Sequence, residues 1–221
     1  MTKLYLGILF LVFTTSASFG QIEQLQIYKN LYRSADSLNK LGRLYSADSG
    51  IIRQVRLLDK EHPANYFEAI GDLMKSSKFD DAAFLYYLAV LRYTYYNEVN
   101  PKYQASGDGA VLSSFKYIIG ESINLYLKTN VDNFVSVLKA SGDYFAKNDY
   151  AFYPKAKNPA KYDTLATGYA ALIKDLETNK EKYRKQWDEE RNQLMIGIER
   201  QIDAYNKMSP EEKKRLKNRN Q

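Results

Sequence analysis

The feature that most constrains this chain is an apolar pattern with the period of an α-helix, which runs along almost its whole length. In residues 23–45, for example, Leu25, Tyr28, Leu31 and Ala35 recur at spacings close to three and four, which places them on one helix face. Segment 50–59 carries β-branched residues that suit a strand. Because no second strand candidate exists to pair with it, we expect a helix there too, and an all-α protein.

Prolines and polar caps divide this pattern into helices. Proline favours the first position of a helix and disfavours helix in the residue before it, so His62-Pro63 and Asn158-Pro159 mark helix starts. Ser209-Pro210-Glu211-Glu212 is a capping box that opens a short last helix. The expected helices are 23–45, 50–59, 64–76, 80–97, 110–128, 131–147 and a long segment from 159. Loops are expected at 100–109 and 148–158, with a turn at 106–109.

The long C-terminal segment has an eleven-residue repeat. Leu176, Trp187 and Ile198 are eleven positions apart, and so are four other residues on a neighbouring stripe, namely Leu172, Tyr183, Leu194 and Tyr205. Eleven residues make about three turns, so each stripe stays on one face. An unbroken helix over 159–207 would be ~74 Å long, whereas a compact domain of this size is roughly 40 Å across. We therefore expect a break near Thr178-Asn179, or a free half that packs on something else.

The first twenty residues have the anatomy of a secretory signal peptide. Lys3 is followed by the apolar stretch Leu4–Phe13 and then by small polar residues that end at Gly20. We expect cleavage after Gly20 and a mature chain in the periplasm or outside the cell. The alternative is an uncleaved anchor, but the apolar stretch is shorter than the ~20 residues a bilayer requires. The expected division is a signal peptide at 1–20, a helical domain at 21–178 and a helical extension at 179–221, with no transmembrane span after cleavage.

Composition excludes several chemistries. The chain has no cysteine and one histidine, so disulfides, thiol nucleophiles and Cys/His zinc sites are ruled out. His62 has no catalytic partner in a recognisable spacing and is expected to be a boundary or cap residue. Two adjacent carboxylate pairs are present, Asp80-Asp81 and Glu189-Glu190. Within each pair the two side chains point about 100° apart on a helix, so they do not converge on one proton or metal ion. We expect no metal, no cofactor and no enzyme; the alternative is a pair of carboxylates brought together by the fold, as in glycosidases.

Tyrosine is the compositional outlier, at 20 of 221 residues. Tyrosine is enriched at protein-contact sites because it offers a large area at little entropic cost. The candidate contact residues are Tyr86, Tyr87, Tyr93, Tyr96 and Tyr103. The alternative is that these tyrosines cover the core with one end in water.

The extreme C-terminus is basic. Its cations are Lys213, Lys214, Arg215, Lys217 and Arg219. Such a tail can contact an anionic lipid or polymer or an acidic partner, or be a solvated end. The net charge of +6 is spread among charges of both signs elsewhere, which is not the dense basic stripe of a nucleic-acid binder.

Residues 66–94 resemble a degenerate tetratricopeptide repeat. In the segment Phe79–Ala89, FDDAAFLYYLA, the residues Ala82, Tyr86 and Ala89 stand at that family's small, aromatic and small positions. The first-helix positions are filled by Tyr66, Ala69 and Leu73. Ile70 replaces the usual glycine, Thr94 stands in place of the closing proline, and no second copy follows. The resemblance implies an antiparallel helical hairpin, within either a repeat-like array or an irregular bundle.

A broader resemblance concerns function. Ala82–Arg92, followed by Gly120–Tyr126, is similar to small exported bacterial helical proteins, some of which are immunity proteins against periplasmic toxins. This resemblance implies a non-enzymatic protein-binding domain that acts by occluding its partner. The alternative is a structural, envelope-associated protein that self-associates through 180–207.

Overall fold

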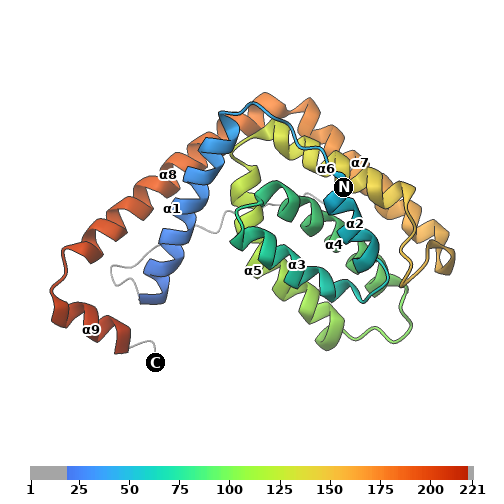
Figure 1. The fold of residues 1–221 in the computed structure, drawn as a ribbon, viewed down its shortest axis with the longest axis horizontal. Coiled ribbons are helices and arrows are strands. Elements are labelled where there is room, and N and C mark those ends of the chain that lie inside the picture. The colour runs from blue at the N-terminus through green and yellow to red at the C-terminus, as the bar shows by residue number, and fades with distance from the viewer. Residues whose placement is uncertain (1–18, 219–221) are drawn as a thin grey trace, which may run out of the picture. The chain divides into compact units, whose positions relative to one another are not determined.

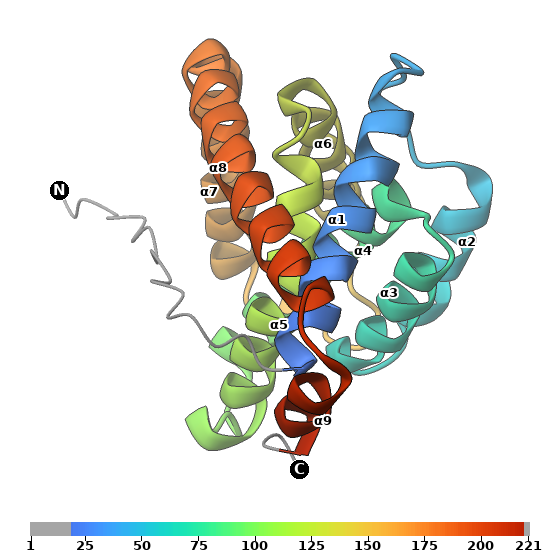
Figure 2. The same cartoon turned by 90° about the vertical axis from the view of Figure 1, so that its left-hand side faces the viewer.

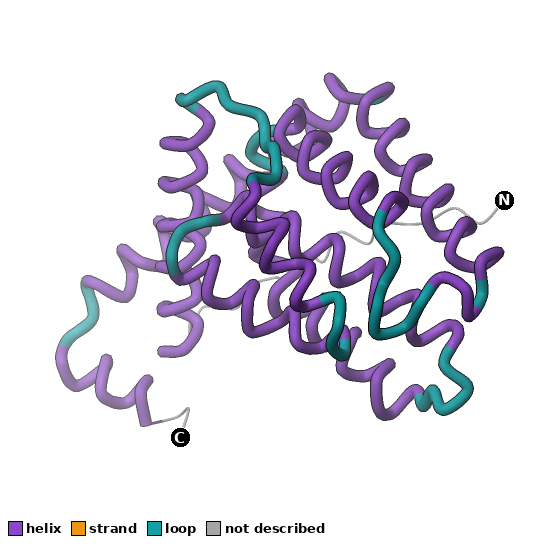
Figure 3. The backbone as a smooth tube through the Cα atoms, turned by 45° about the vertical axis from the view of Figure 1, so that its right-hand side comes forward, coloured by secondary structure: helices purple, strands orange, loops and turns teal. Residues whose placement is uncertain are grey.

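The computed structural model describes the backbone of residues 19–218, with the side chains of 25–216 and 218. Residues 1–18 of the expected signal peptide and Arg219 of the basic tail lie outside this range, and the side chain of Lys217 is not described. All regular elements in the described range are helical (Figures 1 and 3). The predicted all-α fold class is therefore confirmed.

The helices follow the predicted order. They are α1 (Phe19–Asn39), α2 (Ser49–Leu58), α3 (Tyr66–Lys75), α4 (Phe79–Val99), α5 (Ala110–Leu127), α6 (Val131–Lys147), α7 (Pro159–Thr178), α8 (Lys180–Asn206) and α9 (Pro210–Asn218). Three short irregular turns join them: η1 (Pro63–Asn65), η2 (Ala105–Gly109) and η3 (Lys155–Lys157). Segment 50–59 is helical as predicted, because Ile51 and Val55 lie one turn apart and are both buried.

The chain forms two compact units. Within the described residues, unit 1 comprises 19–30 and 193–218, and unit 2 comprises 31–192. Helices α1 and α8 each contribute one part to unit 1 and the other part to unit 2. In unit 1, the buried apolar side chains are Leu25 and Tyr28 of α1 with Ile198 and Ile202 of α8.

Helix α4 is the centre of unit 2. It contacts α3, α5, α6 and α7, and its buried residues are spread around its whole circumference. A helix that is apolar on all sides needs neighbours on all sides. Helices α3 and α4 form the predicted antiparallel hairpin through a short connection at 76–78, and α6 lies beside α7 (Figures 1 and 2).

The predicted caps at helix starts are present. The side chain of Asn158 accepts a hydrogen bond from the amide of Lys161 (3.1 Å) at the start of α7. Ser209 and Glu212 exchange the two reciprocal bonds of a capping box at α9 (2.7 and 3.3 Å). Each cap pairs amides that the first helical turn leaves free.

The long C-terminal segment breaks where predicted. Helix α7 ends at Thr178 and α8 begins at Lys180, with Asn179 between them. The stripe of Leu176, Trp187 and Ile198 is buried on both sides of this break. Helix α1, by contrast, ends earlier than expected, at Asn39, and the chain turns at Gly42, whose φ of +63° is in the left-handed region that favours glycine.

Candidate functional site

A buried ion pair lies at the centre of unit 2. Arg92 of α4 is fully buried, and its Nε and Nη2 donate to the two carboxylate oxygens of Asp59, at 3.1 and 3.2 Å. Asp59 follows α2 and also accepts from the hydroxyls of Tyr66 (2.8 Å) and Tyr144 (3.2 Å). Each carboxylate oxygen therefore has two donors, which is what a buried charge requires.

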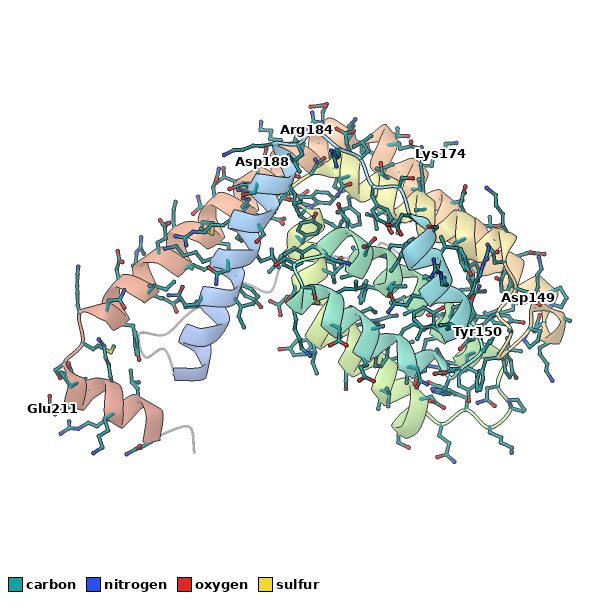
Figure 4. All side chains as sticks on the ribbon, in the orientation of Figure 1. Asp149, Tyr150, Lys174, Arg184, Asp188 and Glu211 are labelled. Carbon is teal, nitrogen blue, oxygen red and sulfur yellow. The ribbon has the colours of Figure 1, made fainter. Side chains whose placement is uncertain are left out.

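The other donors of Arg92 hold the 148–158 loop. Its Nη1 donates to the hydroxyl of Tyr162 (2.6 Å), and its Nη2 donates to the carbonyl of Asn148 (2.8 Å). The ring of Tyr150, next to Asp149 on the loop (Figure 4), lies 5.1 Å from the guanidinium carbon. The hydroxyl of Tyr150 in turn donates to the carbonyl of Glu61 (2.7 Å). The cluster fastens the loop to α2 and α4 and is inaccessible to a substrate.

His62 is a cap residue, as predicted. Its Nδ1 accepts from the amide of Ala64 (3.3 Å), so the proton is on Nε2, which lies 3.3 Å from Oδ1 of Asp108. The same oxygen accepts from the hydroxyl of Tyr93 (2.8 Å). Each imidazole nitrogen therefore has a polar neighbour, on η1 for Nδ1 and on η2 for Nε2.

The adjacent carboxylates of α4 have roles that the sequence did not reveal. Asp80 accepts from the hydroxyl of Tyr126 (2.7 Å) and from the side-chain nitrogen Nδ2 of Asn133 (2.6 Å), while Asp81 accepts from the hydroxyl of Tyr45 (3.1 Å). Burial raises the pKa of Asp81 above its usual value. The two carboxylates thus tie α4 to α5, to α6 and to the linker after α1, and they do not converge on a common point.

The tyrosines that were predicted as contact residues occupy different environments. Tyr86 packs over Gly120 of α5, and burial raises its pKa to about 12. Tyr93 is fully buried, and Tyr87 donates to Asn124 of α5 (2.7 Å). Tyr96 is half-buried, with its ring near His62 at a centroid distance of 5.0 Å. Tyr86 and Tyr93 are therefore part of the internal packing and are not exposed for contact with a partner.

Tyr103 is the exception, since 43% of it is exposed. Its hydroxyl closely approaches Gly109, at the start of α5. Three large apolar side chains of α5 are also exposed: Val111 (43%), Tyr117 (76%) and Ile118 (69%). Val111 and Ile118 are seven residues apart and share a helix face, and Tyr117 is next to it. We call Tyr103, Val111, Tyr117 and Ile118 the α5 surface.

Sequence reasoning missed the α5 surface because a helical period marks the face that packs and says nothing about apolar residues left outside it. Helix α5 packs against α4 and α6 through other residues, including Leu112, Phe115 and Ile123, which are buried. Over its 18 residues it has two charged side chains, Lys116 and Glu121. An apolar, weakly charged face of this kind is typical of a contact surface.

Other kinds of site are not indicated. Within the described range, no cluster of three or more His, Cys, Asp or Glu side chains is arranged to hold a metal ion, and none of its helices has the length and apolar character needed to cross a bilayer. In the basic tail, the amine of Lys213 donates to the carbonyl of Asn206 (3.2 Å), and Lys214 and Arg215 are exposed.

Comparisons with protein-family models, curated proteins and solved structures gave no match.

Proposed function

We propose that this chain is an exported, non-enzymatic protein-binding domain and that the α5 surface is its contact site. The observation that supports this proposal is the exposure of Val111, Tyr117 and Ile118 on one side of a helix whose other side is packed. Aromatic and aliphatic residues of this kind supply most of the binding energy in protein interfaces when a partner covers them. The partner is a folded protein that presents a complementary apolar patch.

The sharpest form of the proposal is an immunity-type function, in which the partner is a toxic periplasmic enzyme. Such a protein needs no catalytic group of its own, since covering the partner's active site is sufficient. The contacts of Asp108 with His62 and Tyr93 then serve to hold the turn that precedes α5. A rigid helix face loses little entropy on binding, which increases affinity.

Site-specific photo-cross-linking tests the contact site. A photoreactive amino acid at position 117 or 118 is expected to cross-link one protein in the native envelope, and the same label at Leu172 of α7 is not. Leu172 is a matched control because it is apolar and 44% exposed. Equal cross-linking at all three positions, or none at 117 and 118, would contradict the proposal.

A second candidate function, structural self-association through 180–207, is supported by unit 1, where Ile27 and Ile196 are each about half exposed. The first half of α8 has less surface to offer, because Trp187 is buried and Lys180 and Arg184 pair with Asp132. Sedimentation of an Ile196→Glu variant tests this alternative. Dissociation of an oligomer by that substitution would favour self-association over the α5 surface.

A further inference from the structure

The segment from Lys40 to Lys60 carries a set of cations that have no acidic partner. Lys40, Arg43, Arg53, Arg56 and Lys60 are all exposed. None of them forms an ion pair with another described residue. Some cations elsewhere in unit 2 are paired, for example Lys139 with Glu177 at 2.5 Å and Lys155 with Asp163 at 2.6 Å, whereas Lys102, Lys174 and Lys185 are exposed and form no ion pair with a described residue.

The cations are unpaired because the acids of this segment are used elsewhere. Asp59 is buried against Arg92. Asp48 accepts from the amides of Gly50 (2.7 Å) and Ile51 (2.9 Å) as the N-cap of α2. Glu61 accepts from the side chain of Asn65. None of these acids therefore forms an ion pair with the five cations, which outnumber the exposed carboxylates Asp48 and Glu61.

Three leucines are exposed among these cations. Leu41, Leu44 and Leu57 are 61%, 58% and 59% exposed. In α2, Leu57 comes two positions after the buried Val55 and so points about 200° away from it, to the solvent side. Arg53 is related to the buried Ile51 in the same way.

We propose that the outward face of α2 and the preceding turn at 40–44 bind an anionic lipid surface. Leucines enter the boundary between headgroups and acyl chains without needing a pocket of matching shape, while cations at the same level meet the headgroup phosphates. This combination distinguishes a lipid surface from an acidic protein, which needs ordered partners for each cation. The inference is independent of the α5 surface.

Vesicle flotation tests the inference on the protein purified from its native cells. The probe is vesicles of phosphatidylcholine with or without about one third phosphatidylglycerol. Binding is expected only to the anionic vesicles, and it is expected to weaken as salt rises, because screening shortens the range of the attraction. If the protein ignores anionic vesicles but is retained by polyglutamate, the face binds acidic protein and the lipid assignment is overturned.

The variant that removes the cations of α2 is Arg53→Ser, Arg56→Ser, Lys60→Ser. Since each cation near an anionic bilayer contributes about fivefold to partitioning, this triple variant is expected to lose binding on the order of a hundredfold. Leu57→Ser is expected to weaken binding most at high salt, where the apolar contribution remains. Circular dichroism and the melting temperature check that each variant is folded.

A charge-matched control removes three exposed cations elsewhere in unit 2. It is Lys102→Ser, Lys174→Ser, Lys185→Ser; of these, Lys174 lies on the outer side of α7 (Figure 4). This control is expected to keep most of the binding. Equal loss in both triple variants would assign the effect to net charge and overturn the inference. Loss on Lys213→Ser, Lys214→Ser, Arg215→Ser, with binding kept in the α2 variant, would overturn it in favour of the basic tail.

Discussion

Arg92 and Asp59 lie 33 positions apart in the sequence and form a buried, two-point ion pair, with Nε and Nη2 of the arginine on the two carboxylate oxygens. The pair joins the end of α2 to the middle of α4, and through Tyr162 and Asn148 it also holds the 148–158 loop. Since Tyr162 belongs to α7, one guanidinium group joins α2, α4, α7 and the 148–158 loop.

Arg92→Met is expected to destabilise unit 2 by about 3–5 kcal/mol, because it leaves the Asp59 carboxylate buried without its counter-charge. Urea denaturation followed by circular dichroism measures this change. Lys75→Met is the control, since Lys75 and its partner Asp72 are both largely exposed, and such pairs contribute at most about 1 kcal/mol. Similar stability in the two variants would show that the buried pair does not hold the unit together.

Gly120→Ala is expected to destabilise the protein by about 1–3 kcal/mol through overpacking. A Cβ at position 120 would overlap the Tyr86 hydroxyl and would meet its ring carbon Cζ at 2.9 Å. Tyr86→Phe in the same chain removes the nearest atom and is expected to recover part of the loss. Thermal unfolding of the parent, of Gly120→Ala and of the double variant measures both effects.

The matched control is Gly71→Ala in α3, where an added Cβ meets nothing within 4 Å. Alanine is the better helix former by roughly 1 kcal/mol, so this variant is expected to be more stable than the parent. If Gly120→Ala also stabilises the protein, Tyr86 does not pack so closely on Gly120 that a Cβ is excluded.

The caps could be predicted from sequence, whereas the partners of the polar groups could not. Asn158 and the Ser209–Glu212 box act on amides within three residues, so local sequence contains the whole interaction. Asp59 and Arg92 meet only after α2 and α4 have packed. No spacing rule marks such a pair.

The tyrosines show the same limit for the site. Adjacent positions on a helix point about 100° apart, so Tyr86 and Tyr87 lie on different faces, but helical spacing does not rank such residues by exposure. Because α4 is surrounded by four helices, even its divergent residues are covered. The exposed apolar face belongs to α5 instead, and its exposure depends on which helices lie beside it.

Acid is expected to remove a specific contribution of Asp48. Hydrogen bonds from the amides of Ile51 and Gly50 lower the pKa of Asp48 below its ordinary value of 3.8. The unfolded chain binds this proton more readily, so the stabilisation is fully present above the unfolded pKa and is lost as the pH falls through the folded pKa.

Asp48→Asn tests this linkage, because asparagine keeps the acceptor of an N-cap but not the charge. The variant is expected to be less stable than the parent at pH 7, and the difference is expected to shrink as the pH falls through the lowered pKa of Asp48. Urea midpoints across this pH range measure the difference. If the difference in the free energy of unfolding between parent and variant does not change with pH, the charge of Asp48 does not contribute to stability.

The first half of α8 is expected to be required by unit 2. Trp187 is buried with its ring centre 5.5 Å from that of Phe134 on α6. Lys128 lies 2.9 Å from Glu190, and Arg191 pairs with Asp36 of α1. A chain that ends at Thr178 loses all of these contacts, whereas one that ends at Asn192 keeps them.

The chain ending at Thr178 is therefore expected to be less stable than the chain ending at Asn192 by at least about 3 kcal/mol, the typical loss on removing one buried tryptophan. Urea denaturation followed by circular dichroism compares the two. Trp187 is the single tryptophan, so its fluorescence reports independently on the longer chain. Equal stability would place the boundary of the helical domain at 178/179, as the sequence predicted. A lower stability of the shorter chain would place the boundary within α8, because the packing of Trp187 continues the core past the break at Asn179.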